Sequence, residues 1–300
     1  MLQSRRAIKP VEDRRFLGIG MVIVAVLMFT GIDTSAKWLA LSGIPPFEIV
    51  FLRYFVHLVI VLAVFLPTQG PGLFRSNNYK LEIIRAIVLL ASTVLNFTAV
   101  KFLPLTVTGS IMFSMPLILT ALSGPLLGEH VGWRRWLAIL VGFAGVLIII
   151  RPGGQEFHWA VFLSIACTIS YAFYNILTRK LAGVDSPYTQ QIYSALVATL
   201  CITPFAFTAW VWPSNAAGWT AFFAMGVLAA VGHLLVTVAH RLAEASVLAP
   251  FVYPQIIFMT AASWLVFADA PDIWIFVGAP VVIGSGLFIW LREKQLADRS

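Results

Sequence analysis

The stretches FSMPLILTA (Phe113–Ala121) and FVYPQIIFMTA (Phe251–Ala261) decide the fold, because each places a proline in the middle of a long apolar run. Pro116 and Pro254 each follow a phenylalanine by three residues and stand 138 residues apart. Two other matches have an offset of 141 residues: Pro46 with Pro187, and GVLIIIR (Gly145–Arg151) with GLFIWLR (Gly286–Arg292). Their common order and spacing indicate that the second half of the chain repeats the first.

Composition identifies the class of protein. Hydrophobic residues make up 60% of the 300 residues and charged residues 11%, against about 45–50% and about 25% in soluble globular domains. The mean hydropathy is +0.90, so we expect an all-α integral membrane protein. The net charge of +7 is scattered over short loops. These loops lack the basic, aromatic-interleaved runs of a nucleic-acid interface, so no nucleic-acid partner is predicted.

Ten transmembrane helices are predicted from the rule that about 20 apolar residues cross a bilayer core of about 30 Å. They are Phe16–Leu39, Pro46–Leu66, Ile83–Phe102, Leu105–Leu127, Trp133–Ile150, His158–Thr178, Tyr188–Trp210, Trp219–His240, Val247–Phe267 and Ile273–Leu291. The first follows basic residues, as the apolar region of a signal peptide does. Because it is longer and carries Asp33 and Lys37 near its end, we expect a retained helix.

The distribution of lysine and arginine predicts the orientation of these helices. With the N-terminus in the cytoplasm, 16 of the 20 basic residues lie on the cytoplasmic side, three lie outside and Arg53 lies within a span. Basic residues gather on the cytoplasmic side of membrane proteins. Both termini are therefore expected to be cytoplasmic.

The repeat divides the chain into residues 1–152, with a cytoplasmic N-terminal tail, and residues 153–300, with five spans each. An odd number of spans inverts the second unit, which is the design of many secondary transporters, with a substrate site between the halves. Each repeated proline removes one helical hydrogen bond. The result is either a structural kink or a flexible, cavity-facing bend, and the matched placement of Pro116 and Pro254 favours the bend.

The first repeat contains AVKFLPLTVTGSIMFSMPLILTALSGPLLGEHVGWRRWLAILVGFAGVLII (residues 99–149). This stretch resembles the fourth-and-fifth-helix signature of the drug/metabolite transporter superfamily, in its ten-helix EamA type. The matching positions are Ala99, Pro116, Gly128, Glu129, Gly142 and Gly145. The second copy, AHRLAEASVLAPFVYPQIIFMTAASWLVFAD, is similar but ends in Phe-Ala-Asp where the signature has Leu-Gly-Glu.

The resemblance implies alternating access through a central cavity lined by helices one to four and six to nine, in a bacterial inner membrane. It favours the branch that exports amino acids, including aromatic ones. Drugs, cations and sugars remain alternative substrates, because the family carries them too. The expected partners are a small-molecule solute and membrane lipids, in a monomer or homodimer. The match at Glu129 suggests a structural or gating salt bridge with nearby Arg134 or Arg135.

Charged residues within spans are costly in a bilayer and indicate function or a specific partner. Asp33 and Lys37 are four residues apart, which allows an intrahelical pair, and Lys37 is assigned a structural or gating role. Arg53 lies at a depth similar to that of Asp33, so an Asp33–Arg53 pair between the first two helices is an alternative. In a third interpretation, Arg53 binds a substrate carboxylate or Asp33 an ammonium group. His57 lies one turn deeper than Arg53, as a structural or titrating histidine.

Polar and aromatic side chains at helical spacing predict the faces that line the cavity, although serine and threonine also join membrane helices without lining a pore. With the charged residues above, the candidates for the substrate cavity are Asp33, Trp38, Arg53, His57, Asn96, Tyr171, Asn175, His233, Tyr253 and Ser263.

Other classes of function lack their motifs. No clustered catalytic residues of a membrane-embedded enzyme occur, and no GxxxxGK[ST] loop for ATP. The two cysteines, Cys167 and Cys201, lie in apolar runs without metal-binding spacing. We therefore expect neither enzymatic activity nor a metal or cofactor. Proton antiport and uncoupled facilitation both remain open, since Asp33 and Glu48 are the only carboxylates placed in or at the spans.

Overall fold

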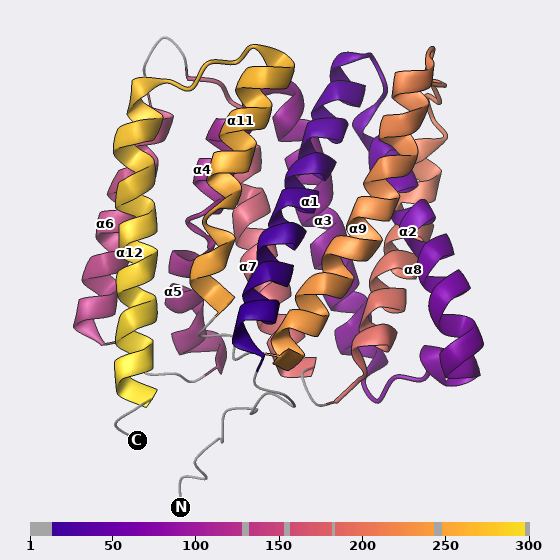
Figure 1. Cartoon of the computed structure of the whole chain (residues 1–300), viewed down its shortest axis with the longest axis horizontal. Coiled ribbons are helices and arrows are strands. Elements are labelled where there is room, and N and C mark those ends of the chain that lie inside the picture. Colours follow the sequence, from indigo (N-terminus) through magenta and orange to yellow (C-terminus); the bar gives the residue numbers. More distant parts are fainter. Residues whose placement is uncertain (1–13, 128–131, 153–156, 182–183, 243–247, 298–300) are drawn as a thin grey trace, which may run out of the picture.

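The computed structural model describes residues 14–127, 132–152, 157–181, 184–242 and 248–297. These residues form a bundle of helices (Figure 1). In chain order they are α1 (Arg15–Leu41), α2 (Pro46–Gln69), η1 (Gly70–Phe74), α3 (Tyr79–Phe102), α4 (Leu105–Met112), α5 (Met115–Leu127), α6 (Trp133–Ile150), α7 (Val161–Leu181), α8 (Pro187–Ala206), α9 (Ala216–Leu242), η2 (Ala249–Val252), α11 (Gln255–Phe267) and α12 (Ile273–Ala297). Helix α1 begins and α12 ends at the same end of the bundle.

Eight segments of the described chain are helical, long and apolar enough to cross a membrane, with α4 and α5 counted as one. The two remaining predicted spans are the 20-residue α8, which carries more polar side chains, and the shorter α11. The fold is therefore the predicted all-α membrane architecture of two inverted five-helix repeats. Helix ends differ slightly from the prediction: α3 begins at Tyr79 because Asn78 Oδ1 accepts a hydrogen bond from the Leu81 N–H at 3.1 Å.

Both repeated prolines stand where one helical segment gives way to the next. Helix α4 ends at Met112, and Pro116 is the second residue of α5. Pro254 is the N-cap residue of α11, two residues after η2 ends at Val252. A proline is well tolerated at the start of a helix, because the N–H that it lacks has no intrahelical partner there. The sequence thus interrupts the fourth helix of each repeat rather than kinking a continuous helix.

The packing of the helices repeats when the two halves are exchanged. Helix α1 packs most extensively on α9, and its counterpart α7 packs on α3. In the same way, the contact of α2 with α9 corresponds to that of α8 with α3. Helices α2 and α8, α6 and α12, and the interrupted helices α4 and α11 pack on their own counterparts. The most extensive contacts join the halves, so the repeats interleave around a shared interior.

Helices α6 and α12 form a closely packed pair at one edge of the bundle (Figure 1). A Cβ atom added to Gly278 would lie 2.6 Å from the carbonyl oxygen of Gly145, and one added to Gly145 would lie 3.0 Å from that of Gly278. Only glycine allows backbones to approach this closely. The pair is thus held by direct contact between the two helical backbones.

We expect Gly278→Ala to lower the free energy of unfolding by about 1–3 kcal/mol, because the added methyl group forces the backbones apart. The measurement is thermal unfolding of the purified chain in lipid nanodiscs. The control is Gly20→Ala in α1, where an added Cβ meets nothing within 4 Å. Equal effects of the two substitutions would contradict the close packing of α6 on α12.

Candidate functional site: a buried polar centre between the repeats

Arg53 of α2 is buried, and neutral groups hold its guanidinium. Its Nη1 donates a hydrogen bond to Thr93 Oγ1 at 3.1 Å. Thr93 lies on α3 and is also 2.8 Å from the hydroxyl of Tyr54. The guanidinium carbon lies 4.6 Å from the centre of the Tyr54 ring. Its Nε has no hydrogen-bond partner within the described chain, so part of the donor capacity of Arg53 is unused.

Asp33 of α1 is buried beside Arg53 without forming a salt bridge to it within the described residues. Its Oδ1 accepts a hydrogen bond from Asn96 Nδ2 of α3 at 2.9 Å. The charge of Arg53 acts on Asp33 over a longer distance. The two opposite charges therefore share one electrostatic environment while each is bonded to a neutral side chain.

Two histidines from opposite halves stack near these charges. The rings of His57 on α2 and His233 on α9 are nearly parallel, with an interplanar angle of 2° and centroids 5.9 Å apart. His57 Nε2 is 3.0 Å from Gln191 Oε1 of α8. Helix α9 approaches α2 closely beside His57: a Cβ added to Gly226 would lie 2.3 Å from Val56 Cβ. The charge of Arg53 acts on both histidines.

Helix α7 adds aromatic and amide groups from the second repeat. Tyr171 stacks on Tyr174 with ring centroids 5.6 Å apart, and the charge of Arg53 acts on its hydroxyl. Asn175 Nδ2 donates to the Tyr171 carbonyl oxygen at 2.7 Å within the same helix. The polar centre thus receives side chains from α1, α2 and α3 of the first repeat and from α7, α8 and α9 of the second.

Within the described chain, no hydrogen bond or ring stacking joins the polar centre to the remaining predicted cavity residues, Trp38, Tyr253 and Ser263. Tyr253 packs against Phe113 near the two interrupted helices, with ring centroids 5.8 Å apart. Trp38 packs against the apolar cluster of α1, α2, α8 and α9. Ser263 of α11 is fully buried, and its Oγ has no hydrogen-bond partner among the described residues. Glu129 lies outside the described residues.

Lys37 has a partner that the sequence did not suggest. Its Nζ lies 2.5 Å from Asp269 Oδ2, in the connection between α11 and α12. It also donates to the carbonyl oxygen of Leu103, at the end of α3, at 3.2 Å. Neither the intrahelical Asp33–Lys37 pair nor the direct Asp33–Arg53 pair is formed within the described chain. Lys37 instead ties α1 to the second repeat at the end of the bundle opposite the start of α1.

A second buried charge cluster lies toward the other end of the bundle. Arg85 Nη2 lies 3.0 Å from Glu82 Oε2 one turn earlier on α3. The same atom donates to Ser194 Oγ and to the Gln190 carbonyl oxygen on α8. From the sequence, Arg85 is only one of the 16 basic residues predicted on the cytoplasmic side. The spacing of three between Glu82 and Arg85 was the signal for their pairing, but it did not reveal the contact with α8.

Asp185, in the connection between α7 and α8, fastens that connection to the segment before α3. Burial raises the pKa of Asp185, but hydrogen bonds from the Asn77 N–H, the Ser76 hydroxyl and the Asn77 amide outweigh this effect. Their net result is a pKa below the ordinary value of 3.8. The Ser76 and Asn77 N–H contacts measure 2.5 and 2.7 Å. The carboxylate thus joins the two repeats outside the membrane spans.

Ten spans in two inverted repeats around a shared polar centre define a membrane transporter. Comparison with protein families supports this class, because the EamA-like transporter family matches residues 16–151 and again residues 158–291. The chain belongs to the EamA-like transporter family. It is thus a multi-pass membrane protein and a small-molecule transporter of the drug/metabolite superfamily.

The chain is similar over nearly its whole length to bacterial transporters of different solutes. A riboflavin transporter of Vibrio cholerae is 28% identical over 299 residues, which cover 97% of this chain and 99% of the relative. An S-adenosylmethionine uptake transporter of Rickettsia bellii is 25% identical, covering 94% and 96%. A pseudopaline exporter of Pseudomonas aeruginosa is 24% identical, covering 89% and 93%.

A solved crystal structure shares the fold. It aligns with a TM-score of 0.61 at 18% identity, covering 91% of this chain and 98% of the other.

We expect Lys37→Met to lower the free energy of unfolding by about 1–3 kcal/mol, because it leaves Asp269 without its cation in a partly buried position. The reversed pair Lys37→Asp with Asp269→Lys should recover part of this loss. Thermal unfolding of the single and double variants in nanodiscs measures both effects. Additive losses in the reversed pair would show that the two side chains do not interact.

Proposed function

We propose that this protein carries zwitterionic metabolites, amino acids or their derivatives, including aromatic ones, by alternating access through the buried polar centre. The observation that carries the proposal is which partners Arg53 and Asp33 bond to. They are opposite charges in one buried environment, yet they are bonded to Thr93 and Asn96 rather than to each other. Burying a charge without a counter-charge is costly, so a ligand that carries both charges would complete the site.

In this arrangement Arg53 accepts the carboxylate of the solute, because a guanidinium with an unused N–H can form charge-assisted hydrogen bonds. Asp33 and Asn96 face the ammonium group. The rings of Tyr171 and of the stacked His57 and His233 supply flat surfaces for an aromatic portion of the solute. A site of this kind discriminates by the two charges and tolerates variation in the side chain between them.

The solutes of the relatives share parts of this chemistry: S-adenosylmethionine carries both a carboxylate and an ammonium group, whereas riboflavin carries neither and shares only the aromatic ring system. S-adenosylmethionine is an amino-acid derivative with an aromatic base, and riboflavin is an aromatic heterocycle. Two of the relatives named above take up or transport their solute and one exports its own. We propose export for this chain, from a bacterial inner membrane with both termini in the cytoplasm. A carrier without ion coupling moves its solute down the prevailing gradient, and proton antiport is the alternative.

The interrupted helices support movement during the transport cycle. Helices α4 and α5 on one side and η2 and α11 on the other each join two segments through a short non-helical turn. Breaks of this kind are tolerated in a membrane where protein or a water-filled cavity surrounds them. In the proposed cycle the segments pivot about Pro116 and Pro254 and expose the centre to one side of the membrane at a time.

The test is uptake and counterflow in proteoliposomes with labelled amino acids, sugars and organic cations, with and without a pH gradient. We expect amino acids to be carried. Arg53→Gln and Asp33→Asn should each reduce this transport about tenfold to a hundredfold, because each removes one charge-assisted hydrogen bond to the solute. The thermal stability of the protein should fall much less than the transport. Arg75→Gln, an exposed arginine outside the centre, is the control.

The double variant Asp33→Arg with Arg53→Asp separates the two roles of these residues. If they bind the solute, the exchange stays inactive although the protein folds. If the pair only stabilises the bundle, the exchange restores transport and the proposed site is wrong. Movement of sugars or cations without any amino acid would remove the proposed substrate class.

A further inference from the structure

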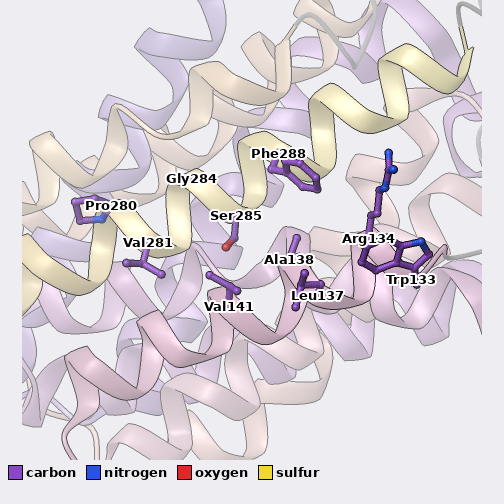
Figure 2. A pocket seen from close by; sticks show the side chains of 10 residues that line it. All are labelled: Trp133, Arg134, Leu137, Ala138, Val141, Pro280, Val281, Gly284, Ser285 and Phe288. Atoms are coloured by element: carbon purple, nitrogen blue, oxygen red, sulfur yellow. The ribbon is translucent and has the colours of Figure 1, made fainter.

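The peripheral pair α6 and α12 forms a groove that the transport site does not use. It has a volume of about 580 Å³ and opens to the surface. Figure 2 shows its lining, in which apolar side chains of both helices predominate and Ser285 is the only hydroxyl group. Both helices cross the membrane, so the groove opens toward lipid.

The hollow of the groove lies at Gly284. A Cβ added to this residue would meet nothing within 4 Å, in contrast to Gly278 two turns earlier, where the backbones touch. Pro280 and Phe288 stand one turn before and one turn after Gly284 on the same helix (Figure 2). The groove is therefore an open apolar channel along the pair rather than a packed interface.

One end of the groove carries a positive charge. Arg134 lies in the first turn of α6, and its guanidinium carbon lies 5.5 Å from the centre of the Trp133 ring. In the part of the chain that the structure describes, Arg134 has no carboxylate partner, and Glu129, its predicted partner, lies outside that part. Tryptophan and arginine at the end of a span are typical of the level of the lipid headgroups. From Arg134 to Val141 the groove follows α6 for about 10 Å at 1.5 Å per residue, parallel to lipid chains.

We propose that this groove binds one anionic phospholipid, with its phosphate at Arg134 and an acyl chain along the hollow at Gly284. The charge at the headgroup level and the apolar channel below it match the two parts of such a lipid. A second copy of the chain fits less well. A two-fold axis along the membrane normal would bring two Arg134 side chains to the same depth at the interface, where like charges repel.

The test is native mass spectrometry of the full chain titrated with phosphatidylglycerol or with phosphatidylcholine of the same acyl chains. We expect one molecule of phosphatidylglycerol to bind about fivefold more tightly than phosphatidylcholine, because one basic side chain attracts an anionic headgroup by about this factor. Arg134→Gln should remove this preference. Gly284→Leu fills the channel and should weaken the binding of both lipids about fivefold or more.

Two matched controls accompany these variants. Gly20→Leu adds the same side chain at another helical glycine with open space around it, and Arg75→Gln removes an exposed arginine from the connection between α2 and α3. Neither should change the binding. The proposal is overturned by equal binding of both lipids, by equal losses in the controls, or by a dimer that Gly284→Leu dissociates. If Gly284→Leu fails to fold, the proposal is still tested by the preference for phosphatidylglycerol and by the loss of that preference in Arg134→Gln.

Discussion

A charged side chain inside a bilayer must find its partners within the protein, because water is absent there, and the interior of this chain is organised by that constraint. Lys37 is paired with Asp269 of the other repeat. Arg85 is paired with Glu82 of its own helix, where that helix contacts the other repeat. Arg53 differs, since it is bonded to a hydroxyl group and lies over an aromatic ring. The one buried cation without a direct carboxylate partner within the described residues thus belongs to the polar centre between the repeats.

The interleaving of the two repeats creates that centre. Because α1 packs on α9 and α3 on α7, side chains of both halves meet where neither half alone could enclose them. The interrupted helices also pack on each other, and a Cβ added to Gly109 of α4 would lie 2.6 Å from Met259 Sδ of α11. Irregular backbone is thereby kept inside protein, as a membrane requires. The same arrangement leaves α6 and α12 at the edge, where lipid reaches them.

Much of the centre could be predicted from helical spacing and depth. Asp33 and Asn96 are both among the predicted cavity residues, and the structure joins them by a hydrogen bond. The pairing of Lys37 could not be predicted in this way. A spacing of four residues allows Lys37 to form an ion pair with Asp33 in the same helix. In the fold, its partner is instead Asp269, which is 232 residues away in the sequence. Helical spacing also does not single out three further residues of the centre, Thr93, Tyr54 and Gln191. Polar residues on membrane helices commonly form hydrogen bonds within the bundle, so their presence alone does not predict a site.

The sequence by itself determined the class of protein, the ten spans, the inverted repeat and the positions of the two interrupted helices. These depend on properties of single segments, namely apolar length, the missing N–H of proline and an odd number of crossings. The tertiary structure alone decided which charges meet, that Arg53 stays apart from Asp33, and that a groove opens beside Gly284. Such features depend on how each helix is rotated and how closely it approaches its neighbour, which the packing of side chains from the whole chain sets.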